Sequence, residues 1–258
     1  MAGCSETTGE GGAGGDAGTG GSAGMGGTAG SGGTTVQYRL RLTVSEPDGS
    51  IAIVQDVEVC EADADTENCA MSDELGVASI VVPADQEILF TIEKEGYGKW
   101  LTADVSDETR EQGVVTRRMH TNAQLEAVAA QLGIDYPWTG GIVGLVRFPT
   151  VARGGLTFTP VGSTIGQVGD DFYYDGALEE YSGDLQATSA FDGIGYLLPL
   201  GDGGFTEITP GEQQFAYGGT AGDCVVSWAW PGDTANTIRL PVREGYRTYG
   251  SMSGCTAP

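Results

Sequence analysis

The stretch VQYRLRLTV at residues 36–44 alternates strictly between apolar and polar side chains, and this alternation is the strongest constraint on the fold. Apolar side chains at every second position place one face of a β-strand on a core and the other face in water. Similar alternation recurs at 78–82, 88–92 and 156–158, with turn sequences such as EPDGS between the runs. Short strands with turn signals about every 8–12 residues are typical of an all-β sandwich.

The first 34 residues do not fit such a sandwich, because they consist mainly of Gly, Ser, Thr and Ala, which have little to bury. We expect this segment to be a disordered, flexible tether. Within it, Ala2-Gly3-Cys4-Ser5 resembles the end of a bacterial lipobox, the motif in which a cysteine becomes the diacylated first residue. The resemblance implies a lipid anchor at Cys4 and attachment to a membrane. A free thiol on a disordered tail is the alternative interpretation.

Charge and cysteine content limit the partners and the compartment. The 258-residue chain has 36 acidic and 12 basic residues and a formal charge of −24, so it repels phosphate backbones and we expect no nucleic acid as a partner. The chain has five cysteines. We expect disulfides between Cys60 and Cys69 and between Cys224 and Cys255, which leaves Cys4 without a partner. Disulfides persist outside the reducing cytosol, so we expect an extracytoplasmic protein, at a bacterial outer membrane or cell surface or secreted. No stretch approaches the roughly 20 apolar residues of a membrane-spanning helix.

The segment CAMSDELGVASIVVPADQEILFTIEKEGY contains the pattern Ser-Asp-x-x-Gly, a strand, Pro, a short turn, a strand and then Gly-Tyr. In this pattern it resembles the carboxypeptidase regulatory-like, or transthyretin-like, domain. The pattern positions are filled by Ser72, Asp73, Gly76, Pro83, Gly96 and Tyr97. The resemblance covers about residues 51–105 and implies a small prealbumin-like β-sandwich, a module without catalytic residues of its own.

A helix and a second sandwich are predicted beyond this module. TNAQLEAVAAQLG has a capping box of Thr121 with Gln124, apolar residues at helical spacing and a glycine stop; the helix could pack across a junction or serve as a spacer. AFDGIGYLLPL and ITPGEQQFAYGG repeat the turn, strand and proline order, which predicts a divergent second copy. We therefore expect an all-β protein of two Ig-like or transthyretin-like β-sandwiches joined by a short helix. The predicted parts are a tether at 1–34, sandwiches at 35–118 and 135–258, and a helical connector at 119–134.

Two groups of aromatic side chains are candidate ligand contacts. CVVSWAWPG places Trp228 and Trp230 at a spacing of two, which suits a sugar-stacking platform, although a core row that shares its face with Cys224 fits the same pattern. GDDFYYDGALEEY places three aromatic rings among aspartates, which suits sugar or calcium-dependent binding, while an ordinary strand edge explains it equally well. These three are Phe172, Tyr173 and Tyr174.

Metal and acid–base candidates are sparse. The hairpin CEADADTENC holds Asp63, Asp65 and Glu67, which are the weak calcium candidates. A calcium loop needs glycine at its sixth position, where this chain has Asn68, so a solvated acidic loop is the favoured interpretation and we expect no cofactor. The single histidine, His120, lies just before the predicted helix, and we expect it at the surface.

No sequence motif marks a catalytic set of residues, and we expect the chain not to be an enzyme. The favoured function is a non-catalytic, lipid-anchored cell-surface or secreted protein whose sandwiches serve structural or protein-interaction roles. A carbohydrate-binding module that uses exposed aromatic rings is the alternative, so the expected partners are other surface proteins or a polysaccharide. A hydrolase is the third hypothesis, because two carboxylates suffice for glycoside chemistry and this chain has many.

Overall fold

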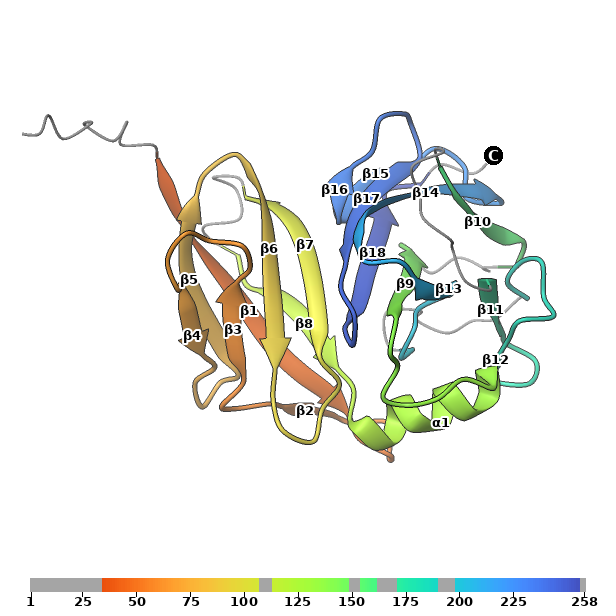
Figure 1. Cartoon of the computed structure of the whole chain (residues 1–258), viewed down its shortest axis with the longest axis horizontal. Coiled ribbons are helices and arrows are strands. Elements are labelled where there is room, and N and C mark those ends of the chain that lie inside the picture. The colour runs from red at the N-terminus through yellow and green to blue at the C-terminus, as the bar shows by residue number, and fades with distance from the viewer. Residues whose placement is uncertain (1–33, 107–112, 149–153, 162–170, 190–197, 256–258) are drawn as a thin grey trace, which may run out of the picture. The chain divides into compact units, whose positions relative to one another are not determined.

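The computed structural model describes residues 34–106, 113–148, 154–161, 171–189 and 198–255. The described residues form three β-sheets and one short helix, so the predicted mostly-β fold is confirmed (Figure 1). Nearly all of the predicted tether lies outside the described residues.

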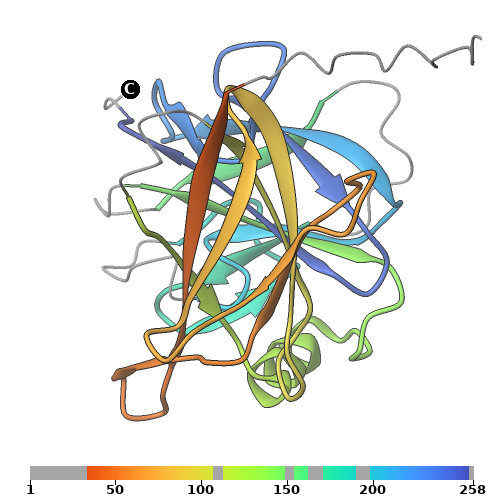
Figure 2. The same cartoon turned by 90° about the vertical axis from the view of Figure 1, so that its left-hand side faces the viewer.

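The first sheet is built around β1 (Thr35–Ser45), the strand with the strict alternation. β1 pairs antiparallel with β2 (Ile51–Ile53) and β5 (Val77–Pro83), and parallel with β8 (Val115–Met119). Figure 2 shows β1 and β5 side by side. Among the described strands β8 pairs only with β1, so β8 is an edge strand.

The second sheet has ten strands and runs through both halves of the described chain. Its order is β12-β11-β13-β9-β18-β7-β6-β3-β4, and β15 pairs with β18. The halves join where β7 and β18 pair in parallel, with Leu101 opposite Thr248. Its strands are β3 (Glu58–Glu61), β4 (Cys69–Met71), β6 (Gln86–Glu93), β7 (Trp100–Ser106), β9 (Gly141–Arg147), β11 (Asp171–Asp175), β12 (Glu180–Ser182), β13 (Gly203–Ile208), β15 (Val225–Trp228) and β18 (Arg247–Ser253).

The third sheet has the order β10-β14-β17-β16. Its strands are β10 (Leu156–Pro160), β14 (Gly211–Gly219), β17 (Thr237–Val242) and β16 (Trp230–Pro231). Two of the three apolar cores among the described residues lie between these sheets, and the third groups side chains of α1, such as Leu125, with Phe172 of β11. Of the first two, one contains Leu40 of β1 and Phe90 of β6, and the other contains Phe215 of β14 and Leu145 of β9. Each of these two cores therefore fills the space between the ten-stranded sheet and one of the four-stranded sheets.

Both predicted disulfides are present. Cys60 and Cys69 face each other across the pair of β3 and β4, with their Cα atoms 4.0 Å apart. Cys224 and Cys255 lie beside the paired strands β15 and β18. Each bridge therefore fastens two segments that are already neighbours in the ten-stranded sheet.

The apolar side chains between Ile51 and Cys60 do not share one sheet. β2 belongs to the first sheet and leaves Ile51 and Ile53 exposed, whereas Val57 and Val59 are buried beside the ten-stranded sheet. The change of sheet occurs near Asp56, whose φ of 50° turns the backbone. The chain therefore crosses from the first sheet to the ten-stranded sheet here, and this crossing interrupts the alternation of apolar residues.

The helix α1 (Asn122–Leu132) forms where it is predicted. Thr121 and Gln124 make the reciprocal capping box, and Gly133 ends the helix in the left-handed conformation. Gln124 Nε2 donates to Ser45 O at 3.0 Å, and Gln131 Oε1 accepts from the amide of Tyr181 at 3.1 Å. The helix therefore packs across the two halves and is more than a spacer.

Residues 33–258 form one unit of tertiary contacts. The domain boundaries at 118/119 and 134/135 remain a prediction. The ten-stranded sheet contains strands from both sides of these boundaries. In the described part of the chain, α1 is too short to cross a membrane, and no other helix is long and apolar enough to do so.

Candidate functional site

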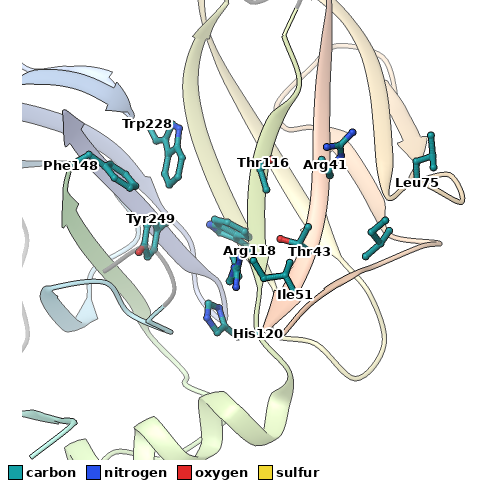
Figure 3. A pocket seen from close by; sticks show the side chains of 12 residues that line it. Arg41, Thr43, Ile51, Leu75, Thr116, Arg118, His120, Phe148, Trp228 and Tyr249 are labelled. Atoms are coloured by element: carbon teal, nitrogen blue, oxygen red, sulfur yellow. The ribbon is translucent and has the colours of Figure 1, made fainter. Parts of the chain in front are cut away.

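A groove with a volume of about 680 Å³ lies between the outer face of the first sheet and a set of aromatic side chains from the second half (Figure 3). We call it the Arg41 groove, after the exposed arginine that lines it from β1. Its volume falls within the roughly 300–1,000 Å³ that is usual for ligand pockets. Among the described cavities it is therefore the best candidate for a binding site.

The strand wall of the groove follows from the period-two pattern. Leu40 and Leu42 of β1 point into the core, so Arg41 and Thr43 point to the other face, where they line the groove. On β8, Thr116 and Arg118 line the groove in the same way, while Arg117 and Met119 are buried.

The aliphatic end of the groove consists of Ile51, Ile53 and Leu75, whose side chains are 57%, 48% and 57% exposed. A tight turn holds Leu75 in place, because the carboxylate of Asp73 accepts the amides of Leu75 at 2.9 Å and Val77 at 2.8 Å.

Gly76 is required in the same turn. Its φ is 70°, and a Cβ there would lie 2.8 Å from the carbonyl oxygen of Leu42. Asp73 and Gly76, two positions of the motif that the sequence singles out, therefore shape this end of the groove.

The aromatic end of the groove combines Phe148, Trp228 of β15 and Tyr249 of β18. Phe148 and Trp228 meet edge to face with ring centroids 5.1 Å apart, and Trp228 and Tyr249 are 6.4 Å apart. The amide of Phe148 donates to Met252 O at 2.7 Å, which ties this residue to β18. The guanidinium of Arg117 lies 4.4 Å from the Trp228 ring centroid, within cation–π distance.

His120, which lines the groove, contacts the buried side chain of Arg247. Arg247 Nη1 is 2.6 Å from His120 Nδ1, and because a guanidinium can only donate, Nδ1 is the acceptor and carries no proton in this arrangement. The Arg247 guanidinium also stacks 4.7 Å from the Trp100 ring centroid. Burial removes the Arg247 guanidinium from water, which disfavours its charged form and lowers its pKa to about 10.

The Arg41 groove is locally positive on a strongly acidic chain. Its described lining includes the cations Arg41 and Arg118 but no carboxylate, whereas the whole chain carries −24. Arg41 makes no ion pair within the described residues, unlike several other exposed cations. These are Lys99 with Glu93 at 3.0 Å, Arg239 with Glu212 at 3.1 Å and Arg243 with Asp63 at 2.7 Å. Donors and apolar faces in this arrangement suit the binding of an anionic ligand.

Of the two predicted tryptophans, only Trp228 lines the groove. A β-bulge between Val226 and Trp228 shifts the pairing with β18, so Val226 packs in one core and Trp228 against the other. Trp230 begins the next strand, packs against the same core as Val226 and donates its Nε1 to Ile88 O at 3.1 Å. The expectation that both rings share one strand face is therefore wrong.

The predicted aromatic cluster on β11 is mainly core. Phe172 and Tyr173 are only 1% and 2% exposed, so their rings are not available to a ligand, and this part of the prediction is corrected. Tyr173 stacks on Phe158 with centroids 5.8 Å apart. Tyr174 is half-buried and meets Tyr181 at 5.2 Å. Burial on both sides of the ten-stranded sheet explains why the aromatic run does not form an open edge.

The acidic hairpin lies away from the Arg41 groove lining. Both carboxylate oxygens of Asp63 accept from Arg243 Nη2 at 2.7 Å, and Asp65 and Glu67 are exposed. Among the residues that the structure describes, no group of three or more His, Cys, Asp or Glu side chains is placed to hold a metal ion. Cys4 lies outside the described residues, so its lipidation stays a prediction.

Sequence reasoning misplaced one groove residue and missed several others. His120 is 2% exposed, against the expectation of a surface position, and its ring contacts the buried guanidinium of Arg247. The alternation of β1 places Arg41 on the outer face, but Phe148, Trp228 and Tyr249 across the groove come from more than 100 residues away. No local signal in the sequence connects these two walls.

No family model and no curated protein matches the chain. Among solved structures the comparison finds only distant likenesses. The TIE protein of Bacillus anthracis is 10% identical with a TM-score of 0.26, and the match covers 86% of this chain but 34% of that one. The minor pilin of Streptococcus agalactiae is 10% identical, with a TM-score of 0.23 and coverage of 86% and 98%. The shaft pilin SpaA of Lactobacillus rhamnosus GG is 12% identical, with a TM-score of 0.25 and coverage of 86% and 100%.

Proposed function

We propose that this chain is an extracytoplasmic, non-catalytic surface protein that binds another molecule in the Arg41 groove. The observation that supports this most is the groove itself, a concave surface with apolar ends and basic groups between them, held in a disulfide-bonded β scaffold. Disulfides persist in oxidising compartments, which supports a location outside the cytosol.

The proposal includes a lipid anchor at Cys4. The lipobox-like Ala2-Gly3-Cys4 and the glycine-rich segment after it support this part, because a flexible tether would present the folded residues away from a bacterial membrane.

Metabolic labelling tests the anchor. Cells that express the full precursor are given an alkyne analogue of palmitate, and the wild type is compared with Cys4→Ser. We expect label and membrane fractionation for the wild type, and loss of both in Cys4→Ser, because diacylation needs the thiol. Ser5→Ala is the matched control and should remain labelled. Label that persists in Cys4→Ser contradicts the anchor.

A carbohydrate ligand is the second candidate, and the Trp228 ring in the groove is the observation that favours it. A glycan array with the purified wild type, followed by Trp228→Ala and Trp230→Ala, tests it. Sugar binding that is lost in Trp228→Ala and kept in Trp230→Ala supports this candidate, since only Trp228 lines the groove. Binding that survives Trp228→Ala removes the site from consideration.

A further inference from the structure

We infer that the occupant of the Arg41 groove is an extended peptide segment of a partner protein, with an acidic side chain flanked by apolar residues. This inference rests on the proposed function and names the ligand class of the same site. Three features of the groove lead to it: its charge, its aliphatic end and its border on an edge strand.

Charge selects an acidic ligand. Arg41 is exposed and makes no ion pair within the described residues, and Arg118 lines the groove beside it on the neighbouring strand. The chain has three acidic residues for every basic one, yet no carboxylate is among the described lining residues. A partner carboxylate would therefore find complementary charge here and repulsion over most of the remaining surface.

The aliphatic end selects a peptide over a glycan. Scattered exposed apolar residues are ordinary, but Ile51, Ile53 and Leu75 lie together in one groove with an aromatic cluster at its other end. Sugar hydroxyls both donate and accept hydrogen bonds, and the described lining has no Asp, Glu, Asn or Gln side chain; the acceptors that it offers are the hydroxyls of Thr43, Thr116 and Tyr249. Apolar peptide side chains on either side of an acid match the observed order of apolar, basic and apolar surfaces.

The edge strand supplies a way to hold the peptide main chain. β8 pairs only with β1 among the described strands, and its Thr116 and Arg118 line the groove. An extended segment can add to such an edge through main-chain hydrogen bonds while alternate side chains enter pockets. The accessible part of this edge is its start at Val115 and Thr116, because Arg117, Arg118 and Met119 are only 1%, 7% and 1% exposed and Arg118 O already accepts from Arg247. The groove therefore combines a short stretch of main chain at this end of β8 with side-chain sites for an acid and for apolar residues.

Selection from a library of random octapeptides displayed on phage tests the inference. The target is the whole chain with both disulfides formed. We expect the recovered peptides to be enriched in Asp or Glu next to apolar residues. One recovered peptide, labelled with fluorescein, is then titrated at low salt against wild type, Arg41→Glu and Arg39→Glu.

We expect Arg41→Glu to weaken binding at least tenfold, because it replaces attraction by repulsion inside the groove. Arg39→Glu is the matched control, since Arg39 lies on the same strand, two residues away and outside the described groove lining, and it should stay within about twofold of wild type. Added salt should weaken the wild-type complex, because screening reduces the attraction of Arg41 for the acid.

Leu75→Ser tests the aliphatic end, with Val81→Ser as its control. Both side chains are similarly exposed, at 57% and 56%, but only Leu75 lines the groove. We expect a loss of about fivefold for Leu75→Ser and none for Val81→Ser.

Several outcomes overturn the inference. These are a selection without acidic consensus, equal peptide binding by wild type and Arg41→Glu, or binding of polygalacturonate that Arg41→Glu abolishes while peptide binding is unchanged. The last result would assign the groove to an acidic glycan. None of these outcomes bears on the lipid anchor, because labelling of Cys4 is measured independently of the groove.

Discussion

Arg117 is charged and almost fully buried, and it connects the core of the first half with the aromatic end of the groove. Its Nη2 lies 3.2 Å from Asp104 Oδ2, and its Nε donates to Thr102 Oγ1 at 3.1 Å. The side chains of Arg117 and Asp104 are only 1% and 3% exposed. Tyr38 also donates its hydroxyl to Asp104. Removing one charge from such a buried pair leaves the other charge without a partner and away from water, which destabilises the fold.

We predict that Asp104→Ala lowers the free energy of unfolding by about 3–5 kcal/mol, measured by urea denaturation. The double variant Asp104→Leu/Arg117→Met replaces the pair with apolar side chains and should recover most of that loss. A loss below about 1 kcal/mol for Asp104→Ala, or a double variant that is less stable than the single one, would contradict this account.

Glu93 and Tyr246 form a second contact between the halves, with a pH dependence that can be measured. Burial acts to raise the pKa of Glu93, but the hydrogen bond from the Tyr246 hydroxyl and the contact with Lys99 outweigh it and leave the pKa below the usual 4.5. A carboxyl group with a lowered folded-state pKa stabilises the fold above its unfolded pKa, and this contribution is lost as the pH falls through the folded value.

Tyr246→Phe should therefore lower the free energy of unfolding by about 1 kcal/mol at pH 7. The difference from wild type should disappear as the pH falls below the lowered pKa of Glu93, because the protonated carboxyl no longer gains from the hydrogen bond. Urea titrations at pH 7, 5, 4 and 3 measure it, with Tyr97→Phe as the control. A stability difference that grows toward acid pH would contradict the predicted direction of the pH dependence.

The two disulfides differ in the length of chain that they close. Cys60 and Cys69 are 9 residues apart in sequence, and Cys224 and Cys255 are 31 apart. In the chain-entropy model the longer loop gives the larger stabilisation, by about 1 kcal/mol here. We predict that the double alanine variant at Cys224 and Cys255 loses about 1 kcal/mol more than the one at Cys60 and Cys69. Calorimetry of both variants measures this, and the reverse order would contradict the prediction.

Local patterns predicted the elements that local interactions determine. The alternation of β1 and the capping box at Thr121 depend on neighbours within a few residues, and both were predicted correctly. The cysteine pairs were also predictable, because each joins segments close in sequence. Where an element depends on its partner strand, prediction failed: the bulge that separates Trp228 from Trp230 is visible only in the register with β18.

The candidate site was only partly predictable, because its two walls are far apart in the sequence. Period two placed Arg41 on the outer face of its strand, and Trp228 was considered a candidate ligand contact. Their position in one groove depends on the sheet that passes from β7 to β18, a parallel pairing with no short-range signal. His120 was misplaced for the same reason, since Arg247, which contacts it, is 127 residues away in the sequence.

At the scale of the molecule, several contacts besides the shared sheet join the halves. Trp230 Nε1 donates to Ile88 O at 3.1 Å, Arg243 pairs with Asp63 at 2.7 Å, and α1 contacts both β1 and β12. The ten-stranded sheet contributes side chains to the core between each pair of sheets. We therefore expect residues 33–258 to unfold in a single cooperative transition. Denaturation followed in parallel by tryptophan fluorescence and far-ultraviolet circular dichroism measures this, and two separated midpoints would contradict it.

The Arg41 groove exists only while the two halves share the ten-stranded sheet, so the most direct test is hydrogen exchange at their junction. The amide of Arg247 donates to Lys99 O at 3.0 Å, next to the parallel pairing of β7 with β18. In native-state exchange by NMR, the β18 amides should be protected with a free energy close to that of the amides between β6 and β7, near the global value. If the β18 amides at the junction exchange like exposed loops while those between β6 and β7 stay protected, the halves separate in solution and the groove is not a permanent feature of the protein.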